Sequence, residues 1–255
     1  TTGNNTYKFY GDGTVKVVGQ KNSLSGITSE ENSQINGVQE LDIEAINNQF
    51  GNPMVLPEKK MYISCGTIYI IDQNDDLWAW GNNNYNKLGQ GNSFLVTEPT
   101  KILEGRTDGA TGVKAKDVWA GYSNTFVLDT ENRLWACGTN VSGTLGQGNT
   151  NIYQNFVQVK NIDESQIQKI AVSTASNVDN AFIIYKNGDV YASGGNSYGS
   201  LGIGNNINQT SFILLSNYNS DIRNVKDIKT AGAAACLLKE NGEVLVTGYN
   251  ASGKL

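Results

Sequence analysis

The sequence predicts an all-β fold of repeated four-stranded blades, arranged as a β-propeller. Three observations support this prediction: a glycine-rich motif occurs four times, a hairpin pattern precedes each copy, and helical periodicity is almost absent. Three or four short strands in every ~55 residues, separated by Gly-rich turns, are typical of propeller blades.

The repeated motif is the first of these observations. Its leading glycine recurs at steps of 57, 56 and 54 residues, an asparagine follows two residues later, and a leucine follows seven residues later, with glycine directly after it in the first three copies. Several fixed offsets shared within one chain indicate an architectural unit rather than a single reactive site. We interpret the following residues as structural: Gly81, Asn83, Leu88 and Gly89; Gly138, Asn140, Leu145 and Gly146; Gly194, Asn196, Leu201 and Gly202; Gly248 and Asn250.

Each motif position has an expected physical role. The leading glycine ends a strand where the backbone turns sharply or approaches another strand closely. The asparagine suits a left-handed or Asx-turn conformation. The leucine is expected to be buried as a knob between neighbouring blades, with Leu255 at this place in the fourth copy.

The hairpins set the predicted boundaries. Two β-rich runs around a short polar turn precede each motif, and a further strand precedes each hairpin. A fifth hairpin at residues 7–19 lacks the motif, so residues 1–60 are predicted to form a degenerate first blade. Its polar stretch near residues 28–50 is either an inserted loop or a short helix. Residues 61–255 are predicted to form the regular blades, the last one cut short, giving about four to five blades in an incomplete ring.

Composition excludes several function classes. The 255 residues carry a formal net charge of −5 and no basic run, which disfavours nucleic-acid binding. The absence of histidine removes Ser-His-Asp and Cys-His nucleophiles and most zinc sites. No apolar run approaches the ~20 residues of a membrane-spanning helix. We therefore predict no enzyme activity, no catalytic residue, no metal, no cofactor and no transmembrane segment.

Two smaller patterns have structural interpretations. Cys65, Cys137 and Cys236 stand far apart in apolar runs, so we predict three free, buried thiols. Asp72 and Asp76 occupy alternate positions like the start of a calcium loop, but the glycine and the acidic residue required later in that loop are missing. A hairpin turn is the preferred interpretation.

The repeated glycine-rich motif resembles the repeats of the regulator-of-chromosome-condensation family. Trp80-Gly81, Asn83 and Leu88-Gly89 match the motif of that family. The family includes a nuclear exchange factor for a small GTPase, a plant ultraviolet-B photoreceptor and a secreted bacterial inhibitor of β-lactamases. The resemblance implies a rigid ring that presents loops to another protein. Asn124 stands where many family blades have histidine. Seven blades, the usual ring, would need roughly 390 residues, so this chain is expected to be a segment of a longer protein.

The predicted function is a non-catalytic protein-binding module that recognises a macromolecular partner through its loops. Richness in Asn and Lys favours a bacterial source, and an extracellular or cell-surface location is expected. The alternatives are an exchange factor for a small GTPase, a secreted inhibitor of an enzyme such as a β-lactamase, and an enzyme with a site in the central channel.

Residues that recognise a partner should differ between repeats and lie on loops. Tyrosine combines a large rigid surface with one hydroxyl, which suits interfaces. The candidates are Tyr85, Tyr122, Tyr198 and Tyr249. The alternative is that these rings only cover neighbouring blades. The partner and the oligomeric state are not predicted.

Overall fold

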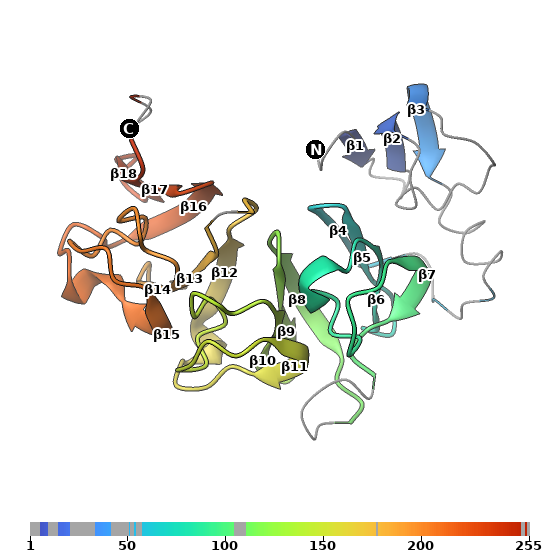
Figure 1. Ribbon diagram of the computed structural model, residues 1–255, viewed down its shortest axis with the longest axis horizontal. Helices are drawn as coiled ribbons and strands as arrows, with labels where there is room; N and C mark the ends of the chain where they lie inside the picture. Colours follow the sequence, from blue (N-terminus) through green and yellow to red (C-terminus); the bar gives the residue numbers. More distant parts are fainter. Residues whose placement is uncertain are drawn as a thin grey trace.

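Five antiparallel sheets follow one another along the chain in the computed structural model (Figure 1). The structure describes residues 51, 54, 58–104, 111–176, 178–250 and 253, together with the strand pairing of residues 6–9, 15–20 and 34–41. We call the sheets blades I to V in chain order. Blades II, III and IV have four strands each, and blades I and V have three described strands each.

The strands alternate in direction within every blade. Blade I comprises β1 (Thr6–Phe9), β2 (Val15–Gln20) and β3 (Gln34–Leu41). Blade II comprises β4 (Lys60–Ser64), β5 (Thr67–Ile71), β6 (Leu77–Gly81) and β7 (Val96–Lys101). Blade III comprises β8 (Ala115–Ala120), β9 (Asn124–Asp129), β10 (Leu134–Gly138) and β11 (Tyr153–Gln158). Blade IV comprises β12 (Ile167–Val172), β13 (Asn180–Tyr185), β14 (Val190–Gly194) and β15 (Gln209–Leu214). Blade V comprises β16 (Val225–Ala231), β17 (Ala234–Lys239) and β18 (Val244–Gly248). Short 3-10 turns are η1 (Asn84–Asn86), η2 (Glu164–Gln166) and η3 (Leu215–Asn217).

The three described strands of blade I correspond to the second, third and fourth strands of the regular blades. The predicted hairpin is present as β1 and β2. The polar stretch, expected to be a loop or a short helix, contains β3 instead, which pairs with β2. The β2–β3 register shifts between Val17 and Gly19, as the β6–β7 register shifts between Ala79 and Gly81. Gly19, which ends the predicted hairpin, therefore occupies the place of the leading motif glycine.

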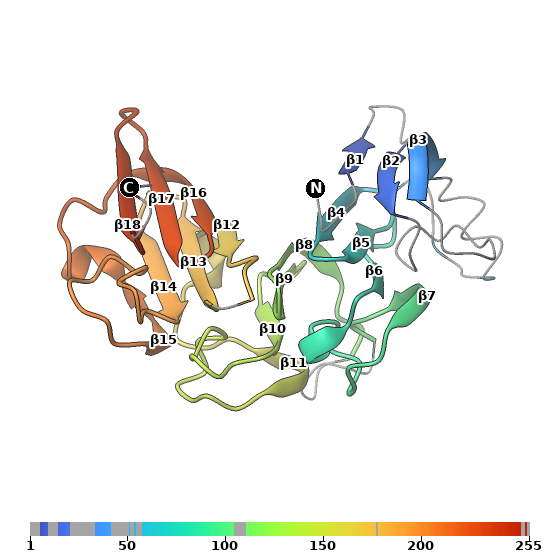
Figure 2. The same ribbon diagram turned by 45° about the horizontal axis from the view of Figure 1, so that its top comes forward.

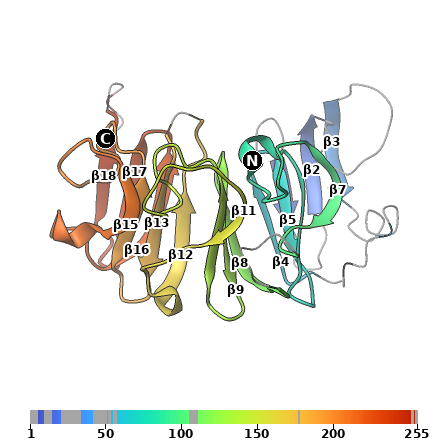
Figure 3. The same cartoon turned by 60° about the horizontal axis from the view of Figure 1, so that its bottom comes forward.

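The blades lie around an open arc (Figures 1 and 2). The first strands of successive blades contact one another: β8 contacts both β4 and β12, and β12 contacts β16. These first strands line the inner side of the arc, while β7, β11 and β15 lie on its outer side (Figure 2). Figure 3 shows the blades standing side by side. The described sheets do not close into a ring.

One position on the inner strands alternates in charge from blade to blade. Lys60 Nζ of β4 lies 2.8 Å from Asp117 Oδ2 of β8, and Lys169 of β12 forms an ion pair with Asp227 of β16. These four side chains are equivalent because each residue pairs with the same place on its second strand, namely Ile71, Leu128, Ile184 or Leu238.

The core lies mainly between blades. Leu88, Leu145 and Leu201 have no exposed surface, as the repeat predicted. Each belongs to a cluster that combines two successive blades; Leu145, for example, shares a cluster with Phe126 of blade III and Ile170 of blade IV. The motif leucine therefore connects its own blade to the next one.

The three cysteines are free, but the prediction that all are buried is wrong. Cys137 is buried, Cys65 is half-buried in a turn, and Cys236 is exposed on β17. The residues equivalent to Cys236 in blades II to IV are fully buried because they face the following blade: Tyr69, Phe126 and Phe182. No described blade covers this face of blade V.

These environments predict an order of thiol reactivity. In the folded 255-residue chain a maleimide reagent should label Cys236 first and Cys65 more slowly. Cys137 should react only after unfolding, since burial removes access and raises the pKa of its thiol well above the ordinary value. Peptide mapping by mass spectrometry should show this order, and unfolding without reductant should expose all three thiols. Rapid native labelling of Cys137 would contradict it.

Candidate interaction face

Two sets of connections lie at one end of the blades. Because the strands alternate in direction, the turn between first and second strands and the loop between third and fourth strands share that end. Neighbouring turns contact one another there: Tyr122 N donates to Ser173 O at 3.0 Å, and Ser123 Oγ donates to Asp179 Oδ1 at 2.6 Å. We call this end the loop face and the connections after the third strands the motif loops.

The motif asparagine holds each complete motif loop together. In blade III, Asn140 Oδ1 accepts from Leu145 N at 2.8 Å, and Asn140 Nδ2 donates to Asn149 O at 2.9 Å. The same two bonds recur at Asn83 and Asn196. The predicted left-handed or Asx-turn role is wrong, since Asn83 has φ −115° and its side chain spans five residues. Gly253 N donates to Asn250 O in the fourth motif, while Leu255 lies outside the described residues.

The leading motif glycines lie where the predicted close backbone approach occurs. Gly81, Gly138, Gly194 and Gly248 have φ between 99° and 110°. A Cβ built on Gly194 would lie 2.5 Å from Asp179 O, which leaves no room for a side chain. The third strand therefore ends directly against the turn between the first two strands.

A hydrogen bond from the start of the second strand to the end of the third strand was not predicted from the sequence. Thr67, Asn124 and Asn180 begin the second strands of blades II to IV, and each donates to the carbonyl that follows the leading motif glycine. Asn124 Nδ2, for example, lies 3.4 Å from Thr139 O. The sequence did contain one indication of this bond. Asn124 stands where many blades of the resembling family have histidine, which is also a hydrogen-bonding side chain.

The four candidate tyrosines form two pairs on the loop face. The rings of Tyr85 and Tyr122 lie 5.5 Å apart between centroids, and those of Tyr198 and Tyr249 lie 4.9 Å apart. Each pair joins successive blades, II with III and IV with V. Tyr85, Tyr198 and Tyr249 are 44%, 47% and 48% exposed, and Tyr122 is half-buried. Three of the four rings are thus exposed, as expected for a surface that meets a partner, and each pair also covers the junction of two blades.

Lys87, two residues after Tyr85, is fully buried. It stands at a motif position filled by Thr144 and Ser200 in the next two loops. Its Nζ donates to Cys65 O at 2.7 Å. Burial lowers the pKa of Lys87 to about 8, because desolvation disfavours the ammonium form.

Lys87 should make folding stability rise with pH above neutrality. Its pKa is lower in the folded chain than the value of 10.5 in an exposed chain, so the unfolded state binds more protons between these values. Stability must then increase with pH in this window. From pH 7 to 9 the wild type should gain on the order of 1 kcal/mol relative to Lys87→Met. Urea unfolding of both proteins tests this, and parallel pH profiles would contradict it.

The described residues contain no group of three or more His, Cys, Asp or Glu side chains placed to hold a metal ion. The DQNDD segment forms the predicted hairpin turn, in which Asp72 Oδ1 accepts from Asn74 N and Asp76 N. No helix in the described part of the chain has the length and apolarity needed to span a membrane.

Comparison with known proteins agrees with this architecture. The family model "Regulator of chromosome condensation (RCC1) repeat" matches residues 74–128, from the β5–β6 turn to β9. The secretion-regulating guanine nucleotide exchange factor of Bos taurus is 32% identical over 127 residues, which are 50% of this chain and 26% of that protein. The X-linked retinitis pigmentosa GTPase regulator of Canis lupus familiaris is 28% identical over 135 residues, 53% of this chain and 13% of that protein. The chain thus spans only a minor part of the length of these relatives.

Solved structures share the fold. Prp20p from Saccharomyces cerevisiae has a TM-score of 0.70 at 16% identity, covering 97% of this chain and 56% of that chain. Human WBSCR16 has a TM-score of 0.66 at 16% identity, covering 92% of this chain and 56% of that chain. At this level of identity the likeness concerns the fold.

Proposed function

Because the chain folds as an RCC1-like β-propeller, we propose that it is a non-catalytic protein-binding module whose loop face contacts the partner. The observation that carries this proposal is the two tyrosine pairs, Tyr85–Tyr122 and Tyr198–Tyr249, in which three of the four rings are exposed. The motif loops that bear Tyr85 and Tyr198 are fixed by the asparagine bonds of Asn83 and Asn196. A partner would therefore meet aromatic side chains that lose little conformational freedom on binding.

The position of the pairs supports recognition by more than one blade. Tyr85 and Tyr198 occupy the same motif position, four residues after the leading glycine, where blade III carries Ser142. The face therefore presents two aromatic patches with a smaller polar residue between them. Two separated anchors of this kind suit a macromolecular surface better than a small ligand.

Removing the aromatic patches should weaken partner binding without loss of stability. The partner in this test is drawn from a panel of purified small GTPases and histones, because Prp20p, which shares the fold, has binding properties toward Gsp1p and histones. The double variants Tyr85→Ala/Tyr122→Ala and Tyr198→Ala/Tyr249→Ala should each lower affinity by about tenfold or more, the range of interface hot spots. Biolayer interferometry and the melting temperature are measured together.

Tyr218→Ala is the matched control. Tyr218 is 53% exposed but follows η3, which comes after the fourth strand and thus lies at the opposite end of blade IV. Its replacement should leave binding unchanged. Two results would overturn the proposal: no binding to any member of the panel, or a tyrosine effect that is matched by a fall in melting temperature.

A second candidate is guanine-nucleotide exchange, favoured by the similarity to a protein named as an exchange factor. It requires that the chain accelerate release of labelled GDP from a small GTPase; binding without release would favour the simple binding module. Secreted inhibition of an enzyme such as a β-lactamase stays an alternative, tested by an inhibition assay. A bacterial, extracellular or cell-surface setting is likewise proposed from composition alone, whereas the relatives described above are eukaryotic.

A further inference from the structure

The motif loops on the loop face carry almost no charge. Three of these loops are described in full, at residues 82–95, 139–152 and 195–208. They contain one charged residue, Lys87, although charged residues make up 17% of the chain. The Lys87 side chain is fully buried. None of the three loops therefore presents a charged side chain to solvent.

The turns between first and second strands contain one further charged residue, Asp179. The described residues of these turns are 65–66, 121–123, 173–176, 178–179 and 232–233. Asp179 is half-buried, and Ser123 Oγ donates to its Oδ1 at 2.6 Å. Burial raises the pKa of the Asp179 carboxyl above its ordinary value, because desolvation disfavours the carboxylate. The described part of the loop face thus has no fully exposed charge.

The opposite end of the blades differs in charge. The hairpin turns between second and third strands lie there, at residues 72–76, 130–133, 186–189 and 240–243. These turns contain seven acidic and two basic residues. One end of the blades is therefore acidic, whereas the loop face is uncharged.

Polar and aromatic side chains occupy the loop face instead of charges. Asn, Gly, Ser and Tyr make up more than half of the residues in the three motif loops. The same residue types dominate antibody binding loops, in which Tyr supplies rigid contact area and Asn and Ser supply adaptable hydrogen bonds. The motif loops of blades II and III also carry four apolar side chains that are more than half exposed, Phe94, Leu95, Val141 and Ile152. The blade that follows is present in the structure for both of these loops.

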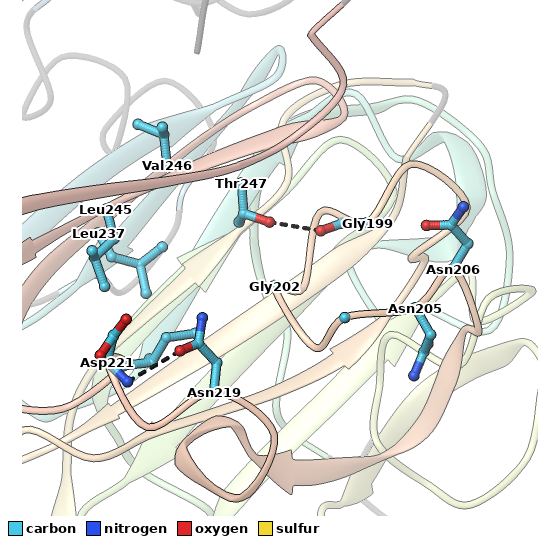
Figure 4. A pocket seen from close by; sticks show the side chains of 12 residues that line it. Gly199, Gly202, Asn205, Asn206, Asn219, Asp221, Leu237, Leu245, Val246 and Thr247 are labelled. Carbon is cyan, nitrogen blue, oxygen red and sulfur yellow. Dashed lines mark hydrogen bonds between the residues drawn. The ribbon is translucent and has the colours of Figure 1, made fainter.

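The motif loops are fixed by the blades that follow them. In blade III, Gly148 N donates to Thr210 O of β15 at 2.8 Å. In blade IV, Gly199 O accepts from Thr247 Oγ1 of β18 at 2.7 Å (Figure 4). The exposed amide of Asn206 lies on the same loop (Figure 4). A partner therefore meets a formed surface and loses little binding energy to loop ordering.

We propose that the loop face of blades II to IV recognises an uncharged surface of a partner protein, built from aromatic, aliphatic and amide side chains. This inference rests on the proposed function and names the chemistry of the partner. A charged group brought against this face would lose its hydration and find no opposite charge, which is costly. Amide and hydroxyl groups, in contrast, meet both donors and acceptors in the exposed side chains of Asn84, Asn151 and Asn206.

The exposed apolar residues favour a protein surface over a neutral glycan. Both kinds of partner are uncharged, and both can contact tyrosine rings and amides. Sugar hydroxyls placed against Phe94 or Leu95, however, would be desolvated without a hydrogen-bond partner. Apolar side chains of a protein would instead be buried favourably there.

Two properties distinguish binding at such a face from electrostatic recognition. Affinity should change little between about 0.1 and 1 M NaCl, although the Debye length falls from about 10 to about 3 Å over that range. Association should proceed without long-range steering, with a rate constant of roughly 10⁵–10⁶ M⁻¹ s⁻¹.

The test uses the 255-residue chain and a displayed library of fibronectin type III domains whose binding loops are randomised over all amino-acid types. Selection takes place in low salt, which favours charged binders. Clones that also bind the Tyr85→Ala/Tyr122→Ala variant are removed. The remaining clones should have fewer Asp, Glu, Lys and Arg residues in their loops than the unselected library. Biolayer interferometry of the purified clones should show affinity independent of salt and unsteered association.

Two charge substitutions at one exposed position sharpen the test. Asn84→Asp and Asn84→Lys place opposite charges beside Tyr85, and each should weaken the selected clones about tenfold or more, since either charge must be desolvated on binding. On an electrostatic surface one sign would weaken binding and the other would strengthen it. Glu131→Lys is the matched control, because it changes the net charge at the opposite end of blade III and should leave affinity unchanged. Melting temperatures show that the variants are folded.

Three results would contradict the inference and leave the proposed function standing or redirect it. The first is a set of tyrosine-dependent clones that carry clustered like charges and lose affinity as salt rises. The second is opposite effects of Asn84→Asp and Asn84→Lys. The third is release of the clones by the neutral oligosaccharide cellohexaose, since the face would then suit a glycan. Absence of any clone that depends on Tyr85 and Tyr122 would instead contradict both the inference and the proposed function.

Discussion

Asp129→Ala should lower the free energy of unfolding by about 3–5 kcal/mol, the cost of removing one partner from a buried charged network. Asp129 has no exposed surface and lies at the end of β9. Its Oδ2 accepts from Trp135 Nε1 at 2.9 Å and from Arg133 Nε at 2.6 Å. Its Oδ1 accepts from the backbone N–H of Glu131 and Arg133. Alanine would leave the buried indole N–H and both turn amides without their acceptor.

Glu131→Ala is the matched control for this change. Glu131 pairs with the same Arg133 at 3.0 Å, but its side chain is 70% exposed. Exposed ion pairs contribute about 0–1 kcal/mol, so the control should alter stability little. Guanidinium unfolding of the three proteins measures the difference. Equal losses at the two positions would show that the β9–β10 turn does not depend on the buried carboxylate.

Leu145→Ala should cost about 2–5 kcal/mol of unfolding free energy, the range measured for buried leucines in well-packed cores. Leu145 has no exposed surface and contacts residues of both blade III and blade IV. The cavity would therefore weaken the joint between two blades. The backbone bond from Leu145 N to Asn140 Oδ1 does not involve the replaced side chain, so the loss reports packing.

Val141→Ala in the same motif loop provides the comparison. Val141 is 61% exposed, so its truncation should change stability by no more than about 0.5 kcal/mol. Thermal unfolding and urea unfolding should agree on the order of the variants. A Leu145→Ala protein as stable as the Val141→Ala protein would contradict the role of the motif leucine as an inter-blade contact.

The repeated sequence predicted the positions that every blade needs. Leu145 and Gly138 were identifiable because the same residue types recur at fixed offsets, and both have the predicted burial or close approach. The repetition did not indicate which hydrogen bonds a polar side chain makes. Asn140 was therefore predicted to form a local turn, whereas its side-chain amide bonds to the backbone of Leu145 and Asn149 across the loop.

Features that depend on how blades sit beside one another were not predictable from one repeat. Cys236 lies in the same kind of apolar run as Cys137, but no described blade covers it and it is exposed. The Lys60–Asp117 ion pair joins residues 57 positions apart whose proximity follows from the arc. The candidate tyrosines could be placed on loops, but their pairing across blades required the structure. Their role in binding stays a prediction.

The alternating charges of the inner strands bear on how the chain avoids misassembly. Tandem repeats of similar sequence are prone to pair in the wrong order during folding. Because the blades present similar contact surfaces, a blade can pack against one that is not its neighbour in the chain. Skipping a blade here would bring Lys60 to Lys169, or Asp117 to Asp227, at the position where ion pairs form in the native order. Like charges at a contact are repelled, so every such mispairing loses an attraction and gains a repulsion. These four side chains therefore disfavour contacts that skip one blade.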